Sequence, residues 1–228
     1  MNENQINELK ARLRREFDAA CELIPMKYRG ITPSKLEANP KSHLPLAEQT
    51  KLYAEINAKP LEGWAFFAPA GFSKTTCSWA IFKHALLANL KRAVITGQEE
   101  YVRPGPTRRI RLFTPCYVWH VSVPEWLERI QASWDDPMVE KPALTAEKIE
   151  KDRRAGFVPR VFLEEIDKIK EGSEWATGKL FNLLNEIDKH KGQLVLDSNL
   201  SKQQFLARFG EPFCRRVKEN CNMREFGF

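Results

Sequence analysis

The chain has 228 residues, of which 43% are hydrophobic and 29% charged, and its formal net charge is +6. These values are typical of a folded globular domain and exclude disordered, fibrous and collagen-like chains. No apolar run approaches the length of a membrane span, and the N-terminus lacks the basic-then-apolar order of a signal peptide. We therefore expect a cytoplasmic protein with one main core and no membrane association.

The positive charge is compatible with a polyanionic partner, because clustered Lys and Arg bind phosphates and release counterions. Many basic proteins bind no nucleic acid, so composition alone is weak evidence. The five cysteines are odd in number and scattered, with no C-x-x-C pair and no histidine at metal-ligand spacing. We expect all five to be reduced.

Residues 1–45 are predicted to form an amphipathic helix followed by a linker. Between residues 2 and 24 apolar side chains recur at steps of three or four, which predicts one apolar helical stripe: Ile6, Leu9, Leu13, Phe17, Ala20 and Ile24. This helix could pack on its own domain or serve as a partner-binding arm. Prolines and a glycine break the rest into an irregular linker.

Residues 46–228 are predicted to form one α/β domain. After a helix at 46–58, strands alternate with helices; the expected strands are 63–67, 117–123, 158–165 and 192–198, and the expected helices 74–90, 124–134 and 174–189. This alternation favours a mainly parallel sheet covered by helices on both faces, a three-layer arrangement. The segment 222–228 is predicted to be a last strand.

The segment from about 91 to 116 interrupts the alternation as a basic insertion. It contains the turn sequence RPGP and four arginines, Arg103, Arg108, Arg109 and Arg111. Two interpretations remain open, a solvated loop or hairpin and a contact with nucleic acid or a partner.

The stretch FFAPAGFSKTTC, residues 66–77, lies between a predicted strand and a predicted helix. A loop in this position directs backbone N–H groups and the positive end of a helix dipole at a phosphate. The phosphate-binding pattern of Gly, four residues, Gly, Lys and Ser/Thr maps onto Ala68, Ser73, Lys74 and Thr75. We expect Lys74 to neutralise phosphates, Thr75 to hold Mg²⁺, and the nucleotide to contact Ala70, Gly71, Phe72, Ser73, Lys74, Thr75 and Thr76.

Two further motifs follow the loop in the order that nucleotide hydrolysis requires. The sequence VPRVFLEEID ends a strand in Glu164 and Glu165, which suits one acid for Mg²⁺ and one for the attacking water. The strand in GQLVLDSNLS runs into Asn199, which could lie between the terminal phosphate and that water. Taken singly, the acids could be a helix start and Asn199 a turn or helix cap.

With these residues in hand, the chain resembles the AAA+ ATPases of the DnaC and IstB group from about residue 24 to 217. APAGFSKT is similar to the AAA+ form G-P-P-G-x-G-K-T, and FLEEID to its D-E-I-D. The most specific pieces are SNLS and FGEPFCRRV, which match the group's S-N-L-S and G-E-x-x-x-S-R-L. The resemblance implies a P-loop NTPase fold without a C-terminal helical lid.

The resemblance also implies a role for each matching residue. Lys74 and Thr75 are the phosphate and Mg²⁺ ligands, Glu164 the metal-organising acid, Glu165 the general base and Asn199 the sensor. Arg216 matches the arginine finger that stabilises transition-state charge from a neighbouring subunit, with Arg215 as the adjacent candidate and a structural salt bridge as the alternative. A homo-oligomer that binds ATP and Mg²⁺ follows.

Three residues depart from the family pattern at the nucleotide, namely Ala68, Ser73 and Glu164. We expect Ser73 to be harmless, and Ala68 and Glu164 to bear on how well ATP is hydrolysed. The implied function is an ATPase that acts on single-stranded or other DNA as a loader of a replicative helicase. The alternatives are a transposition helper that delivers a transposase, and a nucleotide-binding scaffold that has lost hydrolysis.

Overall fold

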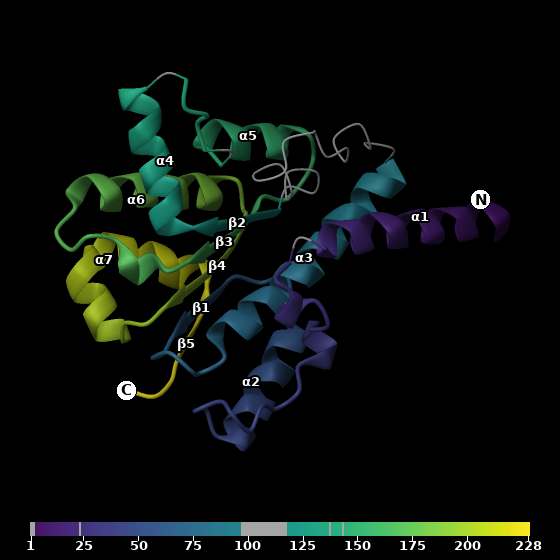
Figure 1. Cartoon of the computed structure of the whole chain (residues 1–228), viewed down its shortest axis with the longest axis horizontal. Helices are drawn as coiled ribbons and strands as arrows, with labels where there is room; N and C mark the ends of the chain where they lie inside the picture. Colours follow the sequence, from purple (N-terminus) through teal and green to yellow (C-terminus); the bar gives the residue numbers. More distant parts are fainter. Residues whose placement is uncertain (1–2, 23, 97–117, 137, 143) are drawn as a thin grey trace.

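The computed structural model describes residues 3–22, 24–96, 118–136, 138–142 and 144–228. Its centre is a five-stranded sheet with the order β2-β3-β4-β1-β5, in which every neighbouring pair is parallel (Figure 1). The strands are β1 (Trp64–Phe67), β2 (Val118–Ser122), β3 (Arg160–Glu164), β4 (Gln193–Ser198) and β5 (Asn222–Glu225). The predicted parallel α/β architecture is confirmed.

Helices cover both faces of this sheet. They are α1 (Glu3–Cys21), α2 (Leu46–Ala58), α3 (Lys74–Thr96), α4 (Val123–Asp135), α5 (Ala146–Arg154), α6 (Glu174–Lys189) and α7 (Lys202–Asn220). Short 3-10 turns lie at Met26–Tyr28, Pro33–Lys35 and Ile166–Lys168. In the part of the chain that the structure describes, no helix is long and apolar enough to cross a bilayer.

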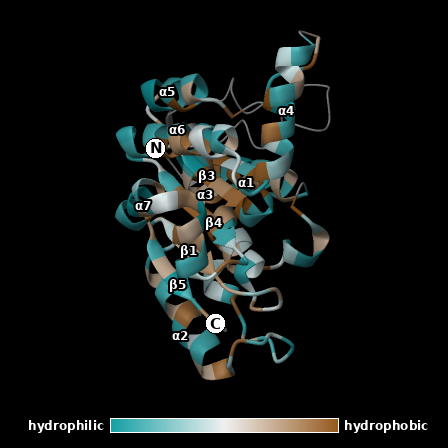
Figure 2. Cartoon of the chain, turned by 90° about the vertical axis from the view of Figure 1, so that its left-hand side faces the viewer, coloured by the Kyte–Doolittle hydropathy of each residue, from teal (hydrophilic) through white to brown (hydrophobic). Residues whose placement is uncertain are grey.

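The strands divide the core into two hydrophobic clusters, because successive side chains point to opposite faces of a sheet. Phe66, Phe162 and Val195 lie in the cluster that contains α2 and α3, together with Trp79 and Phe82 of α3. The neighbouring strand residues belong to the opposite cluster with α4, α6 and α7; they include Ala65, Phe67, Val161, Leu163, Leu194 and Leu196. Figure 2 shows hydrophobic residues gathered along the strands between the helices.

The amphipathic helix α1 packs on its own domain. Leu13, Phe17 and Ala20 lie against the cluster on the α3 side of the sheet, while most of the other α1 residues are exposed. The N-terminal end of α1 lies at the periphery of the molecule (Figure 1). This part of the predicted stripe is therefore a packing surface, and a partner-binding role for the helix stays a prediction.

Two element boundaries differ from the sequence-based expectation. Helix α3 continues to Thr96 instead of ending at residue 90, because its apolar pattern extends into the segment that we assigned to the insertion. The rest of that insertion, with Arg103, Arg108, Arg109 and Arg111, lies outside the described residues. Helix α7 combines two helical pieces across Gly210, which has φ 78°, and Pro212 follows in the second piece.

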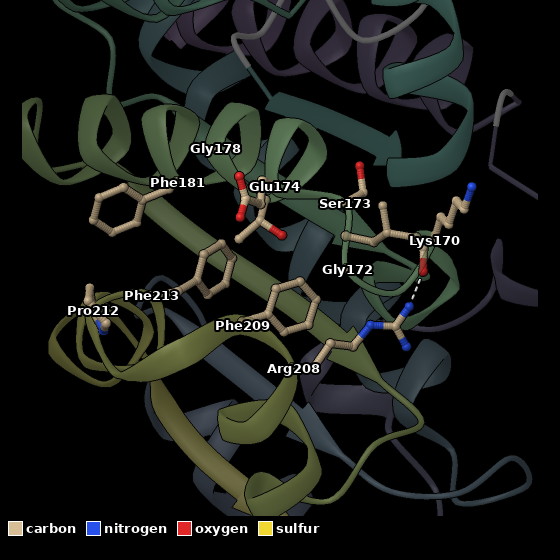
Figure 3. A pocket seen from close by; sticks show the side chains of 12 residues that line it. Lys170, Gly172, Ser173, Glu174, Gly178, Phe181, Arg208, Phe209, Pro212 and Phe213 are labelled. Carbon is tan, nitrogen blue, oxygen red and sulfur yellow. Dashed lines mark hydrogen bonds between the residues drawn. The ribbon is translucent and has the colours of Figure 1, made fainter.

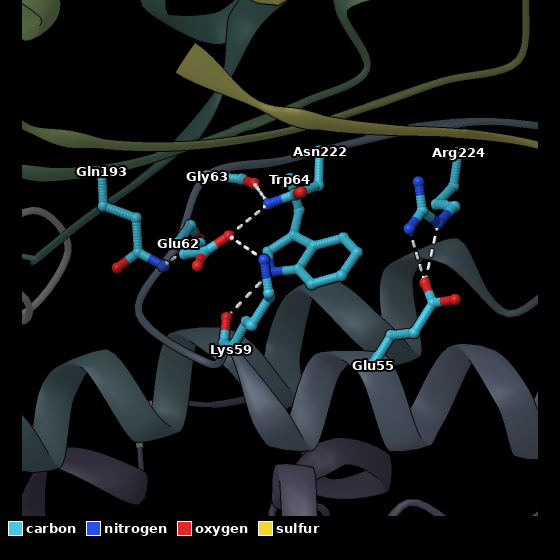
Figure 4. Close-up of polar contacts among 8 residues, drawn as sticks. All are labelled: Glu55, Lys59, Glu62, Gly63, Trp64, Gln193, Asn222 and Arg224. Atoms are coloured by element: carbon cyan, nitrogen blue, oxygen red, sulfur yellow. Dashed lines mark hydrogen bonds and ion pairs between the residues drawn. The ribbon is translucent and has the colours of Figure 1, made fainter.

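Polar contacts attach the edge strand β5 to α2 and to the turn between α2 and β1 (Figure 4). Arg224 donates to Glu55 Oε2 from Nε at 2.9 Å and from Nη2 at 2.6 Å. Asn222 Nδ2 donates to Glu62 Oε2 at 2.8 Å and to the Gly63 carbonyl at 3.1 Å. Half-exposed ion pairs add little stability singly, so their main effect is to fix the position of β5 beside β1.

Gly63 marks the closest backbone approach at this edge. A Cβ at this position would lie 1.9 Å from the Asn220 carbonyl oxygen and 3.0 Å from that of Leu194. We expect Gly63→Ala to lower the free energy of unfolding by about 2 kcal/mol, since backbone atoms must move. Gly178→Ala in α6, where a Cβ meets nothing within 4 Å, should raise it by about 0.5 to 1 kcal/mol.

Chemical denaturation of both variants measures this difference. Equal stability of Gly63→Ala and the wild-type protein would contradict the packing described for this edge.

Candidate nucleotide-binding site

The loop between β1 and α3 has two residues in the left-handed backbone conformation, and only one of them is a glycine. Gly71 has φ 90° and Ser73 has φ 62°, so both lie in the left-handed region. Ala68 is not among the residues with positive φ; its N–H donates to the Ser198 carbonyl at 3.1 Å, and its side chain is buried. The backbone strain is thus at Ser73 and not at Ala68, while the effect of Ala68 and Glu164 on hydrolysis stays a prediction.

A segment that precedes the domain covers the loop. His43 N–H donates to the Gly71 carbonyl at 3.0 Å, and a Cβ on Gly71 would lie 2.9 Å from the His43 ring. Ser42 Oγ donates to the same carbonyl at 3.3 Å. The sequence assigned these residues to an irregular linker and gave no signal that they cover the phosphate-binding loop.

Lys74 is the first residue of α3, and the residue as a whole is mostly buried, at 8% exposure. Its Nζ donates to the carbonyl oxygens of Ala68 and Pro69, at 2.8 Å in the case of Pro69, and to Asn199 Oδ1 at 3.0 Å. All three acceptors are uncharged. Burial lowers the pKa of Lys74, and the nearby Asp197 and Asp167 partly oppose this effect.

Asn199 joins the end of β4 to this lysine. Its backbone N–H donates to Asp167 Oδ1 at 2.9 Å, and its Nδ2 donates to Asp167 Oδ2 at 3.0 Å. These two bonds orient the amide so that its oxygen faces Lys74. Two residues separated by 125 positions in the sequence therefore meet at the carboxyl ends of the strands.

A polar row crosses the sheet below the start of α3. His120 Nε2 of β2 lies 3.1 Å from Glu164 Oε1 of β3, although neither atom has a hydrogen-bond partner of good geometry within the described chain. Asp197 of β4 is the next member. Burial, reinforced by the charge of Glu164, raises the pKa of Asp197 to about 7.

Glu165 follows β3 in a left-handed conformation, with φ 60° and ψ 33°. Its N–H donates to Asp197 Oδ1 at 3.3 Å, and its carboxylate pairs with Lys168. Because the backbone turns at this residue, Glu164 stays on the sheet while Glu165 extends toward solvent.

These residues line one pocket of about 410 Å³. Its walls include Tyr28, Asn39, Lys41, Ser42, Ala70, Gly71, Phe72, Ser73, Lys74, Thr75, Thr76, Glu165, Lys168, Asp197 and Asn199. The predicted nucleotide residues 70–76 are thus brought together with Glu165 and Asn199. The sequence analysis did not identify Asp197, although its carboxylate stands two residues before Asn199 at the end of a predicted strand.

Arg216 lies away from this pocket, on α7. Its guanidinium donates from Nη1 to Asp188 Oδ2 at 2.7 Å and to Glu219 Oε2 at 3.0 Å, and from Nε to Asn185 Oδ1 at 3.1 Å. Its neighbour Arg215 has a side chain 68% exposed, with a 3.9 Å contact to Glu219. The structural salt bridge that the sequence left open is present at Arg216.

A second pocket of about 540 Å³ lies between α6 and α7 (Figure 3). Phe181, Phe209 and Phe213 line it, and Arg208 at its rim donates to the Ile169 carbonyl. None of the predicted site residues lies in it, so we assign it no part in nucleotide chemistry.

The pocket beside α3 has the donors that Mg²⁺ requires in the presence of a nucleotide. No group of three His, Cys, Asp or Glu residues that could hold a metal occurs in the described ranges. Mg²⁺ in nucleotide enzymes binds one or two protein oxygens and completes its shell with phosphate and water. Thr75 and Asp197 line the pocket, with Glu164 beside Asp197, and these residues fit that requirement.

Comparison with known proteins bears on the fold. No family model matches the chain, and no curated protein matches it significantly. Among solved structures it is similar to the DnaC helicase loader, with a TM-score of 0.55 and 12% identity over 89% of this chain and 100% of that chain. The chain is also similar to AMPPCP-bound DnaA from Aquifex aeolicus, with a TM-score of 0.52 and 12% identity over 89% of this chain and 51% of that chain.

A primosome component from Streptococcus pyogenes gives a TM-score of 0.50 at 13% identity, over 92% of this chain and 95% of that chain. The chain has an AAA+ fold. The DnaC-like architecture expected from the sequence motifs is confirmed, and β5 is the last strand as predicted. At identities of 12% to 13%, these similarities show the fold alone.

The strain at Ser73 gives a direct test of the loop. The Ser73 hydroxyl also interacts with Tyr53, so Ser73→Gly must be compared with Ser73→Ala, which removes the hydroxyl and keeps the Cβ. We expect Ser73→Gly to be more stable than Ser73→Ala by about 1 kcal/mol, because only glycine tolerates positive φ without steric cost.

Ala68→Gly should instead lower the free energy of unfolding by about 1 kcal/mol relative to the wild-type protein. The reasons are the loss of a buried methyl group and a more flexible unfolded chain. Denaturant titration of the three variants measures both effects. A loss at Ser73→Gly larger than that at Ser73→Ala would contradict the assigned backbone conformation.

Proposed function

We propose that this protein binds and hydrolyses ATP with Mg²⁺ as an AAA+ ATPase of DNA replication, most like a DnaC-type helicase loader. The observation that supports this best is the contact of Lys74 with Asn199 in a pocket that also contains Glu165 and Asp197. A lysine buried among neutral oxygens at a helix N-terminus provides a site for an anion.

ATP binding follows from the loop. Residues Gly71 to Thr76 line the pocket at the start of α3, where helix N–H groups have no partner within the helix. Lys74 then exchanges its carbonyl partners for phosphate oxygens, and its charge offsets theirs. In this proposal the Thr75 hydroxyl holds Mg²⁺, which when bound would neutralise phosphate charge during transfer.

Hydrolysis requires a base and a group that orients water. Glu165 supplies the base in this proposal; its carboxylate pairs with Lys168 and is close enough to solvent to accept a proton from water. Asn199 is fixed by Asp167 and therefore holds its amide beside the terminal phosphate without reorganisation.

The assembly and partners belong to the same proposal. Two similar structures are titled as a helicase loader and as a replication initiator bound to AMPPCP and single-stranded DNA. We extend these properties to this chain as a homo-oligomer that contacts single-stranded DNA and a replicative helicase. The IstB-like transposition helper keeps the same site chemistry with a transposase as partner.

Phosphate release measured with and without single-stranded DNA tests the activity. We expect turnover by the wild-type protein, no turnover by Lys74→Ala, and a loss of at least about 100-fold in Glu165→Gln, the scale of a missing general base. Glu171→Gln, an exposed acid outside the pocket, serves as the matched control and should retain wild-type turnover.

ATP binding by the wild-type protein without turnover above the Glu165→Gln background would contradict the enzyme assignment. It would favour a scaffold that has lost hydrolysis.

Arg215 and Arg216 of α7 differ in exposure and in their contacts within the chain. Arg216 is engaged in its own chain, whereas Arg215 is exposed, so we assign the contact with a neighbouring subunit's phosphates to Arg215 and a structural role to Arg216. The sequence had matched Arg216 to the arginine finger and kept Arg215 as its alternative.

Single substitutions separate these roles. Arg215→Ala should keep nucleotide binding and lower turnover by about 10³-fold, the effect of a missing arginine finger. Arg216→Ala should lower the free energy of unfolding by about 1.5 to 3 kcal/mol, because charged hydrogen bonds are lost. Turnover and denaturation of both variants decide the assignment; wild-type turnover in Arg215→Ala would refute it.

A further inference from the structure

Asp197 is placed as a second acid beside the one that the sequence pattern identifies. Leu163 of β3 pairs with Leu196 of β4, so Glu164 and Asp197 are adjacent across the two strands. Phe162 and Val195, two residues earlier on each strand, pack in the cluster of α3. By alternation along a strand, both carboxylates lie on the α3 face, beneath the phosphate-binding loop.

The burial of Asp197 calls for a positive partner. The residue is 6% exposed, and its only hydrogen bond among the described residues is the one that Oδ1 accepts from the Glu165 N–H. Its second oxygen therefore has no donor there. A buried carboxylate is stabilised by a nearby cation, and the charge of Lys74 acts on Asp197.

Glu164 lies near His120 on the other side of the row. Its Oε1 lies 3.1 Å from His120 Nε2, and the His120 ring stacks on Trp79 at 4.1 Å between centroids and meets the edge of Phe82 at 5.8 Å. These rings fix the imidazole, which leaves Glu164 facing β2. Asp197 is the carboxylate on the side of Lys74, and it lines the pocket with Thr75.

We propose that Asp197 is the protein carboxylate that holds Mg²⁺ of the bound nucleotide with Thr75, and that Glu164 acts as a positioning residue through His120. The inference rests on the proposed ATP site and changes which acid serves the metal. The glutamate at position 164 extends to His120 of β2. Carboxylate and hydroxyl oxygens are the ligands that Mg²⁺ prefers.

Nucleotide affinity measured with Mg²⁺ and with EDTA tests this role without reference to turnover. For the wild-type protein we expect tighter binding of ATP with Mg²⁺. In Asp197→Asn the ratio of ATP affinity with Mg²⁺ to ATP affinity in EDTA should fall at least about tenfold. The affinity in EDTA should stay equal or increase, because a negative charge near the phosphates is gone. Glu164→Gln should lose less than Asp197→Asn.

Asp135→Asn, an exposed acid at the end of α4, is the matched control for the same chemical change. The assignment would be overturned if Asp197→Asn kept the wild-type gain in ATP affinity with Mg²⁺. It would also be overturned if Glu164→Gln lost more of that gain than Asp197→Asn. Failure of the wild-type protein to bind ATP under either condition would instead refute the proposed function itself.

A second measurement needs no substitution. Fe²⁺ bound in place of Mg²⁺ with ADP cleaves the backbone near its ligands when ascorbate and peroxide are added. We expect fragments that end near residues 75 and 197. Cleavage near residue 164 without cleavage near 197 would contradict the proposal.

Discussion

The structure of this site depends on one buried positive charge. Lys74 stands at the N-terminus of α3, where the helix dipole is also positive, and its ammonium contacts two carbonyl oxygens and one amide oxygen. Such a charge is costly to bury without an anion. Asp197 and Asp167 partly offset this cost, and under the proposed function a nucleotide phosphate completes the compensation.

The remaining architecture serves to hold this arrangement. All five strands are parallel, so their carboxyl ends converge at one edge of the sheet, and the loop after β1 lies next to the end of β4. The apolar cluster below α3 fixes the helix axis, and His43 covers Gly71 from outside. Asp167 then sets the orientation of Asn199. Packing of the strands and helices thus determines where the polar groups of the site lie.

The sequence predicted the parts of this site that depend on order and spacing. Strand alternation gave the parallel sheet, and the motif order placed Lys74 and Asn199 together before any contact was known. Backbone conformation was not accessible in the same way, because Ala68 and Ser73 are both small and only their φ angles distinguish them. Asp197 could not be predicted as a site residue, because it occupies a strand position. The role of a buried acid in a strand depends on which residues lie beside it in the fold, and the sequence does not specify these. The intrachain partners of Arg216 likewise come from α6 and from the next turn of α7, which a motif does not specify.

The most direct test of the central claim is equilibrium binding of a non-hydrolysable ATP analogue to the wild-type protein and to Lys74→Ala, with Mg²⁺ present. The account predicts saturable binding by the wild-type protein and an affinity at least about tenfold weaker for Lys74→Ala, since one charge-assisted phosphate contact contributes roughly 1.5 to 3 kcal/mol. No binding by the wild-type protein, or equal binding by both proteins, would contradict it.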